Sequence, residues 1–181
     1  RELPRYTVLV PVFREANIVA QLIKNLGGLD YPTEKLEVLI LIEEEDHETR
    51  DAVLASSPPP HFRIVTIPKG QPQTKPRACN VGLYFATGDY LVIYDAEDTP
   101  DPDQLKKAVV AFERGGTETV CVQAALNYFN DTENVLTRMF TLEYSYWFDY
   151  MLAGLDVANL PIPLGGTSNH FRTAALLELG G

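Results

Sequence analysis

An acidic stretch near the middle of the chain is the clearest candidate for chemistry. Residues 91–94 read Leu-Val-Ile-Tyr, and Asp95, Glu97 and Asp98 follow almost directly. Ligands of open α/β sheets collect at the carboxyl ends of strands, so carboxylates at a strand end are well placed to meet one. Asp95 and Glu97 are two residues apart in an extended turn and can point the same way. The pair is compatible with a hard divalent cation.

Two further carboxylates, Asp101 and Asp103, precede the helix that we expect from about residue 102 to 114. Aspartate is a favoured N-cap residue, and proline suits the start of a helix. We therefore expect Asp101 and Asp103 to cap this helix. The same capping role is the alternative for Asp95 and Glu97, for which a ligand role is favoured.

The elements that must position these residues alternate along the chain. Apolar runs typical of buried strands are each followed by a segment with helical spacing. The strands are expected at residues 6–12, 36–42, 62–67 and 91–94, and the helices at 15–26, 47–55, 75–86 and 102–114. This alternation predicts an α/β fold with a mostly parallel sheet and right-handed crossovers.

The second part of the chain is less regular. Residues 119–125 predict a fifth strand, 161–172 a loop, and 173–179 a helix. Residues 135–153 predict a long aromatic helix, which either packs on the core or lies near a membrane or a missing domain. The apolar face of that helix is formed by Leu136, Phe140, Tyr144, Trp147 and Met151.

Length and composition bound the class of protein. At 181 residues with no sign of disorder, the chain is expected to form a single domain, residues 1–181, cut from a longer protein at its C-terminal side. A formal net charge of −10 argues against nucleic acid as the main partner. Cys79 and Cys121 lack metal-ligand spacing, so we expect reduced thiols that serve packing in a cytosolic setting. The most hydrophobic stretch, 135–155, is interrupted by charged residues and is not expected to cross a bilayer.

Four segments, taken in order, resemble the family 2 glycosyltransferases, whose nucleotide-sugar-binding domain has the GT-A fold. Residues 11–17 are similar to the family's first-strand exit, and 75–80 to its Lys-Ala-x-x-Leu-Asn helix start. Residues 88–98 are similar to its Asp-x-Asp strand, and 165–172 to a glycine-containing acceptor-side segment. The resemblance spans nearly the whole chain and is nearest in pattern to membrane-attached, cellulose synthase-like polysaccharide synthases.

The resemblance implies a Rossmann-like three-layer sandwich and a metal-dependent, inverting transfer. A sugar would pass from a nucleoside-diphosphate sugar, with UDP preferred, to an acceptor hydroxyl. Asp95 would face the nucleotide and Glu97 would bind Mg²⁺ or Mn²⁺ with Asp95 or Asp98, although Glu97 stands where the family usually has Asp. The other nucleotide-binding candidates are Pro11, Val12, Phe13, Glu15, Glu43, Glu44 and Lys75. The acceptor-side candidates are Gly166, Thr167, Asn169, His170 and Arg172.

Several of these candidates have structural alternatives. Lys75 at the head of its helix suits a diphosphate, and its alternative is a solvated surface lysine, with Arg77 in reserve. Glu43 and Glu44 suit the nucleobase, but carboxylates at a helix start are also favourable without a ligand. Glu15 suits the nucleoside or a helix cap. His170 could serve as a base near neutral pH, but a structural or acceptor-side role is preferred for it, as it is for Asn169 and Arg172, with the structural role ahead.

No catalytic base is assigned within the chain. The resemblance places it in a Thr-Glu-Asp-like segment after the glycine-containing segment, and none occurs before Gly181; the family's Gln-x-x-Arg-Trp motif is absent too. The expected partners are a nucleoside-diphosphate sugar and a saccharide or lipid-linked acceptor. The full-length protein is expected at the cytoplasmic face of the cell membrane, held there through segments outside this soluble piece.

Two other classes of protein share parts of this pattern. A sugar-phosphate nucleotidyltransferase should carry a glycine-rich basic loop after its first strand, and residues 11–15 (Pro-Val-Phe-Arg-Glu) are not such a loop. A non-catalytic receiver-like module needs its acidic pair after the first strand, whereas the acidic clusters here follow the second and fourth. A nucleotide-binding domain without activity stays open.

Overall fold

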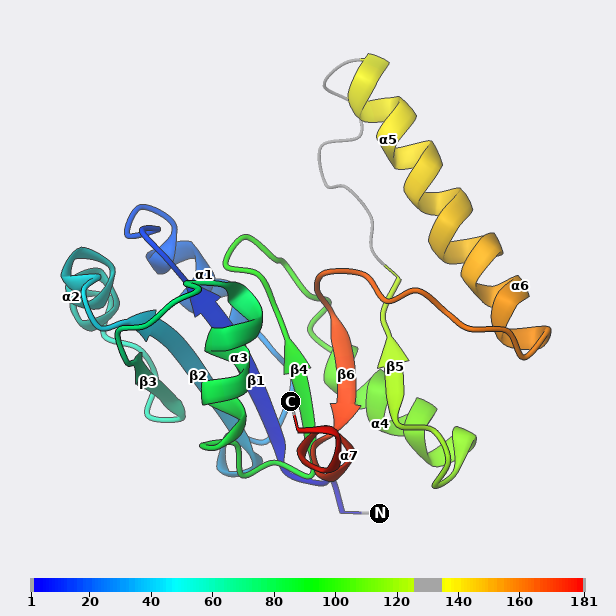
Figure 1. The fold of residues 1–181 in the computed structure, drawn as a ribbon, viewed down its shortest axis with the longest axis horizontal. Helices are drawn as coiled ribbons and strands as arrows, with labels where there is room; N and C mark the ends of the chain where they lie inside the picture. Colours follow the sequence, from blue (N-terminus) through cyan, green and yellow to red (C-terminus); the bar gives the residue numbers. More distant parts are fainter. Residues whose placement is uncertain (1, 126–134, 181) are drawn as a thin grey trace.

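The computed structural model describes residues 2–125 and 135–180. Its centre is a six-stranded sheet with strand order β3-β2-β1-β4-β6-β5 (Figure 1). The strands are β1 (Tyr6–Val12), β2 (Leu36–Glu43), β3 (Phe62–Ile67), β4 (Tyr90–Ile93), β5 (Cys121–Gln123) and β6 (Asn169–Arg172). Strands β1 to β4 are parallel to one another, and β6 is antiparallel to both β4 and β5. The predicted α/β fold with a mostly parallel sheet is confirmed.

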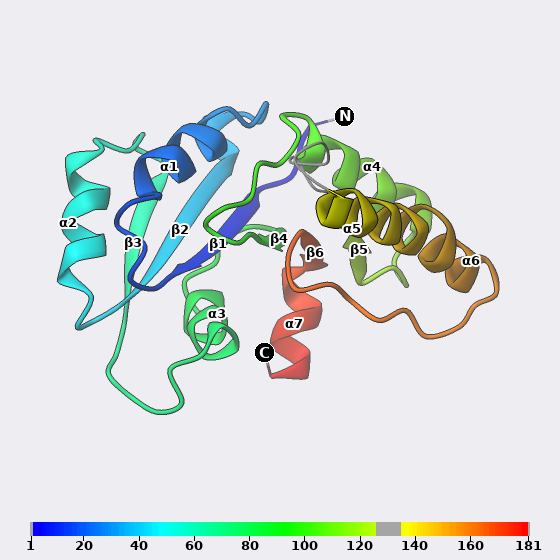
Figure 2. The same cartoon turned by 90° about the horizontal axis from the view of Figure 1, so that it is seen from above.

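Helices cover both faces of the sheet, which gives the expected three layers (Figure 2). One face carries α1 (Val19–Gly27), α2 (His47–Ala55) and α4 (Gln104–Gly115). The other face carries α3 (Lys75–Leu83) and α7 (Thr173–Leu179). A short 3-10 helix, Thr33–Lys35, leads into β2. Several helix bounds differ from the prediction; α1 begins at Val19 rather than Glu15, and α3 ends at Leu83 rather than Ala86.

Two buried clusters explain why the central strands read as continuous apolar runs. Alternate residues of β1 face opposite helical layers, so both sets must be apolar. Val8 and Val10 pack with α1 and α4 in one cluster, while Leu9 packs with α3 in the other. Cys79 belongs to the second cluster, and burial raises the pKa of its thiol to about 11. Both cysteines are free, and the packing role expected of Cys79 agrees with its place.

The loop predicted for residues 161–172 is wrong at its C-terminal end. Residues 169–172 form β6, which inserts between β4 and β5 with Val92 opposite His170. Asn and His have low strand propensity, so no local pattern marks this strand. Hydrogen bonds to two neighbouring strands far away in sequence decide it.

The long aromatic helix forms but does not pack on the sheet. Helix α5 (Val135–Ser145) continues through a π-helical segment, Tyr146–Met151, into α6 (Leu152–Val157), and the rod projects beyond the sheet (Figure 1). Phe140 is 42% and Trp147 37% exposed, so the predicted packing on the core is wrong. The interfacial alternative stays a prediction. Within residues 2–125 and 135–180, no helix is both long and apolar enough to span a bilayer.

Candidate functional site

The candidate site lies where the strand order changes direction. The chain runs from β1 outward through β2 to β3 and then returns across β1 to β4. Such a switch point leaves a crevice at the carboxyl ends of the strands. A pocket of about 220 Å³ opens there. It is lined by Pro11, Val12, Phe13, Glu15, Leu41, Glu43, Gln73, Thr74, Lys75 and Ala78.

The loop after β1 is held in place by the start of α2. Arg14 has a left-handed backbone with φ of 56°, and its N–H donates to Asp46 Oδ2 at 2.6 Å. The N–H of Glu15 donates to Thr49 Oγ1 at 3.2 Å. Asp46 also caps α2 by accepting from the N–H of Thr49. This places Phe13, a residue that is 44% exposed, on the rim of the pocket.

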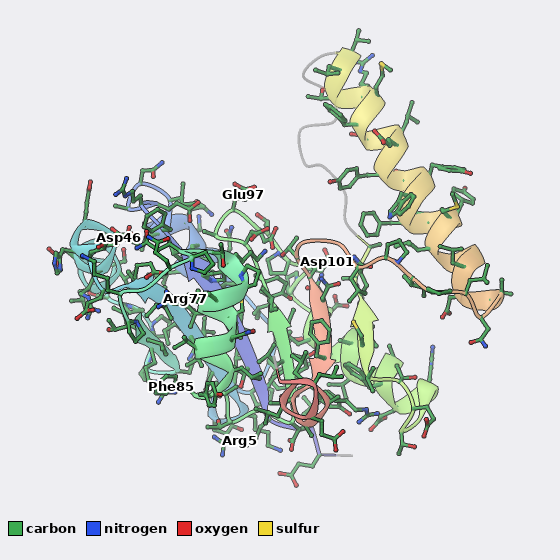
Figure 3. All side chains as sticks on the ribbon, viewed as in Figure 1. Arg5, Asp46, Arg77, Phe85, Glu97 and Asp101 are labelled. Atoms are coloured by element: carbon green, nitrogen blue, oxygen red, sulfur yellow. The ribbon has the colours of Figure 1, made fainter. Side chains whose placement is uncertain are left out.

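Asp46, which holds the loop after β1 in place, is a structural residue of the site that the sequence analysis does not include. Burial alone would raise the pKa of its carboxyl group, but hydrogen bonds from Arg14 and Thr49 lower it below its ordinary value. The sequence does contain a signal for this capping role, because Asp is a favoured residue directly before the start of a helix. Figure 3 shows Asp46 and Glu97 at the carboxyl edge of the sheet, with Arg5 and Phe85 at the opposite edge.

Glu15 faces the pocket and does not cap α1. The N-cap of α1 is Ile18, with no side-chain hydrogen bond at that cap. Burial raises the pKa of Glu15, and the carboxylates of Glu97 and Asp95 raise it further, against a backbone hydrogen bond with Phe13. The carboxylates of Asp95 and Glu97 therefore lie close enough to Glu15 to repel its charge, and a bound cation would relieve that repulsion.

The acidic pair after β2 separates into two different roles. The Glu43 side chain is 7% exposed, lines the pocket and lies 3.3 Å from Arg77 Nη1. Glu44 is exposed, accepts a hydrogen bond from the N–H of Lys69, and is not among the pocket-lining residues. Only Glu43 of this pair is positioned to face a ligand in the pocket.

Arg77 clamps the loop that leads into α3. It donates to the carbonyl oxygen of Pro68 as well as to Glu43. Its guanidinium lies against Gly70, where an added Cβ would come within 2.7 Å of Nη2. Arg77 therefore shapes the pocket wall and is already engaged, unlike the reserve phosphate ligand that the sequence suggested.

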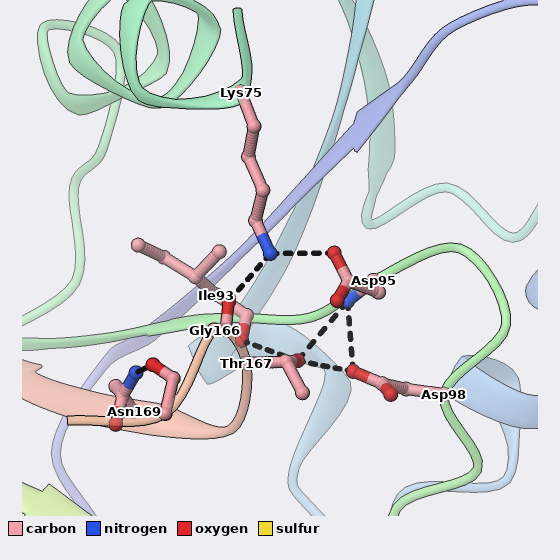
Figure 4. Close-up of polar contacts among 8 residues, drawn as sticks. Lys75, Ile93, Asp95, Asp98, Gly166, Thr167 and Asn169 are labelled. Carbon is pink, nitrogen blue, oxygen red and sulfur yellow. Dashed lines mark hydrogen bonds and ion pairs between the residues drawn. The ribbon is translucent and has the colours of Figure 1, made fainter.

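Lys75 joins three parts of the site (Figure 4). Its ammonium lies 2.5 Å from Asp95 Oδ1 and 2.5 Å from the carbonyl oxygen of Gly166. The two side chains of this ion pair are 35% and 39% exposed. Lys75 is thus a member of the site, and the solvated surface alternative does not describe it.

The three carboxylates after β4 differ in their partners. Asp98 Oδ2 accepts from the N–H of Asp95 at 2.7 Å and from the hydroxyl of Thr167. Burial raises the pKa of Asp98, while those two hydrogen bonds act against the rise. Glu97 is exposed and has no hydrogen bond or ion pair among the described residues.

Asp101 and Asp103 do not cap α4 as predicted. Asp103 occupies the N-cap position, but its side chain makes no capping hydrogen bond. Both carboxylates instead lie near the ammonium of Lys107, at 2.8 Å for Asp103 and 3.4 Å for Asp101. An ion pair one turn along the helix competes with the cap for the same oxygens.

The acceptor-side candidates divide between the two edges of the sheet. Gly166 and Thr167 lie beside Asp95, and Asn169 donates to the carbonyl oxygen of Gly165 at 2.6 Å. Because β6 runs antiparallel to β4, Arg172 lies opposite Tyr90 at the amino edge. Arg172 stacks on Tyr90 and bonds backbone oxygens of the loop before β5. For Arg172 these contacts support the structural alternative and not the acceptor side.

For His170 the structure supports the structural alternative and not the acceptor side. Its side chain is fully buried, and its Nδ1 lies 2.6 Å from the hydroxyl of Tyr6. Burial lowers its pKa to about 4. A neutral imidazole inside the core cannot face an acceptor, so His170 is a packing residue of the α4 side of the sheet.

The side chains of the site can hold a divalent ion only together with oxygen atoms of a bound substrate. No group of three or more His, Cys, Asp or Glu residues able to hold a metal occurs in residues 2–125 and 135–180. Asp95 and Glu97 can supply two carboxylates. Mg²⁺ is usually bound by one or two carboxylates together with substrate phosphates, so the residues fit a metal that arrives with a diphosphate.

Comparison with known sequences identifies relatives of this chain. The family model for glycosyl transferase family 2 matches residues 7–176. The probable glycosyltransferase YdaM of Bacillus subtilis (strain 168) is 27% identical over 100% of the chain, which covers 43% of that protein. Glucomannan 4-beta-mannosyltransferase 2 of Arabidopsis thaliana is 27% identical over 98% of the chain and 34% of its own length. The chain thus spans less than half the length of these relatives.

Solved structures share the fold. The mannosyltransferase PcManGT from Pyrobaculum calidifontis, in complex with GDP-Man and Mn²⁺, matches with a TM-score of 0.74 and 24% identity, over 99% of this chain and 48% of that one. Glucosyl-3-phosphoglycerate synthase from Mycobacterium tuberculosis, solved with Mn²⁺, UDP and glucosyl-3-phosphoglycerate, matches with a TM-score of 0.59 and 17% identity, over 96% and 58% of the two chains. At these identities the likeness shows the fold, and it does not favour the nucleotidyltransferase or receiver alternatives.

Proposed function

The chain belongs to glycosyl transferase family 2, and from that premise we propose that it binds a nucleoside-diphosphate sugar for transfer to an acceptor hydroxyl with inversion. The observation that carries the proposal is the pocket beside the Lys75–Asp95 pair at the switch point of the sheet. Ligands of open α/β sheets bind in this crevice. Residues 1–181 would form one GT-A domain of a longer enzyme.

The pocket offers separate surfaces to the parts of a donor nucleotide. The exposed face of Phe13 suits a nucleobase, and Glu43 provides a carboxylate acceptor in the pocket wall. The ammonium of Lys75 uses two of its three N–H donors on Asp95 and Gly166, which leaves one for a phosphate oxygen. We propose UDP as the preferred nucleotide, although structural neighbours hold GDP-Man as well as UDP.

We propose that Asp95 and Glu97 hold Mg²⁺ or Mn²⁺ together with the diphosphate. The ion would balance the charge of the leaving nucleoside diphosphate. The repulsion among Glu15, Asp95 and Glu97 supports this placement, because the chain concentrates negative charge where the cation would lie. Two structural neighbours were solved with Mn²⁺.

The acceptor and the cellular setting are proposed from the relatives. A glucomannan mannosyltransferase among them supports a saccharide acceptor, with a lipid-linked acceptor as the other choice. We propose membrane contact through segments outside residues 1–181, at the cytoplasmic face. We place no catalytic base in the part of the chain that the structure describes. His170 is buried, Asp98 accepts a hydrogen bond from the backbone of Asp95, and Asp95 and Glu97 are proposed to hold the metal ion.

Calorimetric titration tests the proposal. UDP and GDP are each titrated into the chain with and without Mn²⁺, and UDP binding that needs the ion is expected. Asp95→Ala should abolish that binding, because it removes a metal ligand and the partner of Lys75. Asp103→Ala, which removes an ion pair with Lys107 and no pocket-lining residue, is the matched control and should bind normally. If no nucleoside diphosphate binds to a folded sample, the proposed function fails.

A further inference from the structure

Asp98 and Thr167 make a contact that the proposed function does not use. They are separated by 69 residues, yet the Thr167 hydroxyl donates directly to Asp98 Oδ2 (Figure 4). The same oxygen accepts from the N–H of Asp95 at 2.7 Å. We propose that Asp98 and Thr167 are positioning residues, which hold the acceptor-side turn against Asp95, and that Asp98 is not a metal ligand. The role in positioning an acceptor rests on the proposed function, whereas the hydrogen bonds themselves do not depend on it.

The turn formed by residues 95–98 is closed on itself by Asp98. The N–H of Asp98 donates to the carbonyl oxygen of Asp95 at 3.1 Å, and the Asp98 carboxylate accepts from the N–H of Asp95 in return. The backbone of Asp95 is therefore fixed from both ends of the turn. Asp98 Oδ2 is thus engaged by two donors that fix its carboxylate against the Thr167 turn, whereas Glu97 is exposed and without such partners among the described residues.

The turn formed by residues 165–168 is tied to β4 by several bonds. The N–H of Ser168 donates to the carbonyl oxygen of Ile93 at 2.8 Å, and Ser168 has a left-handed φ of 56°. The Thr167 hydroxyl lies 3.2 Å from the N–H of Asp95. Gly166 accepts from Lys75 at 2.5 Å. The hydroxyl of Thr167 is the side-chain link between this turn and the 95–98 turn.

These contacts form a closed ring. From Asp98 the ring passes through Thr167 and Gly166 to Lys75, and from Lys75 through Asp95 back to Asp98. Because the ring is closed, loss of one of its hydrogen bonds should make the turns on both sides of that bond more mobile. The donor-side carboxylate and the acceptor-side turn are therefore positioned together, which suits a reaction in which an acceptor oxygen must line up with a bound donor.

Hydrogen exchange of the unliganded chain tests the ring directly. Thr167→Val removes the hydroxyl and keeps the shape, while Thr167→Ser keeps the hydroxyl. We expect Thr167→Val to speed amide exchange about tenfold in both residues 93–98 and 165–168, as the loss of a hydrogen bond to a charged group predicts. Thr167→Ser should exchange like the wild type. Faster exchange confined to residues 165–168, or no change, would overturn the inference.

A double-mutant cycle and a conservative variant separate positioning from metal binding. Asp98→Ala combined with Thr167→Val should perturb UDP and Mn²⁺ affinity no more than the larger single change, since both break one ring. Asp98→Asn keeps an acceptor oxygen and should retain affinity within about threefold. Additive losses, or an Asp98→Asn loss equal to that of Asp98→Ala, would show a metal ligand instead. Hydrogen exchange is measured without nucleotide. A failure of UDP to bind would therefore refute the proposed function, while the exchange rates would still test the ring of hydrogen bonds.

Discussion

Replacing His170 by phenylalanine should remove part of the dependence of stability on pH. The imidazole is fully buried among aromatic rings, with Tyr6 and Tyr94 in edge contact. Phenylalanine fills a similar volume and has no titratable group. The change therefore tests whether His170 belongs to the core, as its burial indicates, or to an open acceptor site.

The size of the effect follows from linkage. Burial lowers the pKa of His170 from 6.5 to about 4. The unfolded chain therefore takes up a proton before the folded chain does, and protonation favours unfolding. The stability that His170 contributes is complete above pH 6.5 and is lost as the pH falls towards 4. This loss amounts to about 3 kcal/mol, since each pKa unit corresponds to roughly 1.4 kcal/mol.

Urea unfolding between about pH 4 and about pH 7.5 measures this loss. The free energy of unfolding of the wild type should fall relative to His170→Phe by about 3 kcal/mol across that range. His61, whose pKa burial also lowers, is present in both proteins and cancels in the difference. Tyr6→Phe is the matched control, because it removes the hydroxyl partner and keeps the titrating ring. Parallel curves for wild type and His170→Phe would refute the buried placement.

Two further substitutions test the opposite edges of the sheet. Lys75→Met should weaken UDP binding about tenfold in calorimetry, because it removes the one pocket-lining cation beside Asp95 in the described structure; unchanged affinity would contradict its role. Arg172→Met should lower the unfolding free energy by about 2 kcal/mol, through loss of its stacking on Tyr90 and its bonds to backbone oxygens. It should leave UDP affinity unchanged, and a weaker affinity would contradict its place at the far edge.

Strands buried on both faces were predictable, whereas strands defined by distant pairing were not. The bounds predicted for β1 agree with the structure, because apolar side chains on both faces leave a local signature. The bounds predicted for β3 agree too, although Arg63 and Thr66 of this edge strand are exposed. In β6, Asn169 and His170 carry no such signature, and the strand exists because β4 and β5 accept its backbone hydrogen bonds. The long helix was predicted as an element, but its position depends on contacts that its own sequence does not encode.

The candidate site shows the same division. Lys75 begins α3 as the sequence predicts, and Phe13 lines the pocket together with it, since both positions follow from motifs at a strand exit and a helix start. The engagement of Glu43 by Arg77 was not predictable, because it joins the end of β2 to α3 across the pocket. Asp46 was overlooked although its position before α2 marked it as a cap.

The sequence by itself determined that carboxylates stand at the ends of buried strands. Parallel strands bring their carboxyl ends to one edge, so Asp95 and Glu97 lie at the edge of the sheet where the pocket opens, and Asp95 reaches it through Lys75. Only the tertiary structure decided which of the carboxylates after β4 has no side-chain or backbone partner among the described residues. Asp98 is occupied by Thr167, and His170 is turned into the core, because a reversed strand inserts beside β4. Side-chain partners far apart in the chain are set by strand order and direction, which a local pattern does not contain.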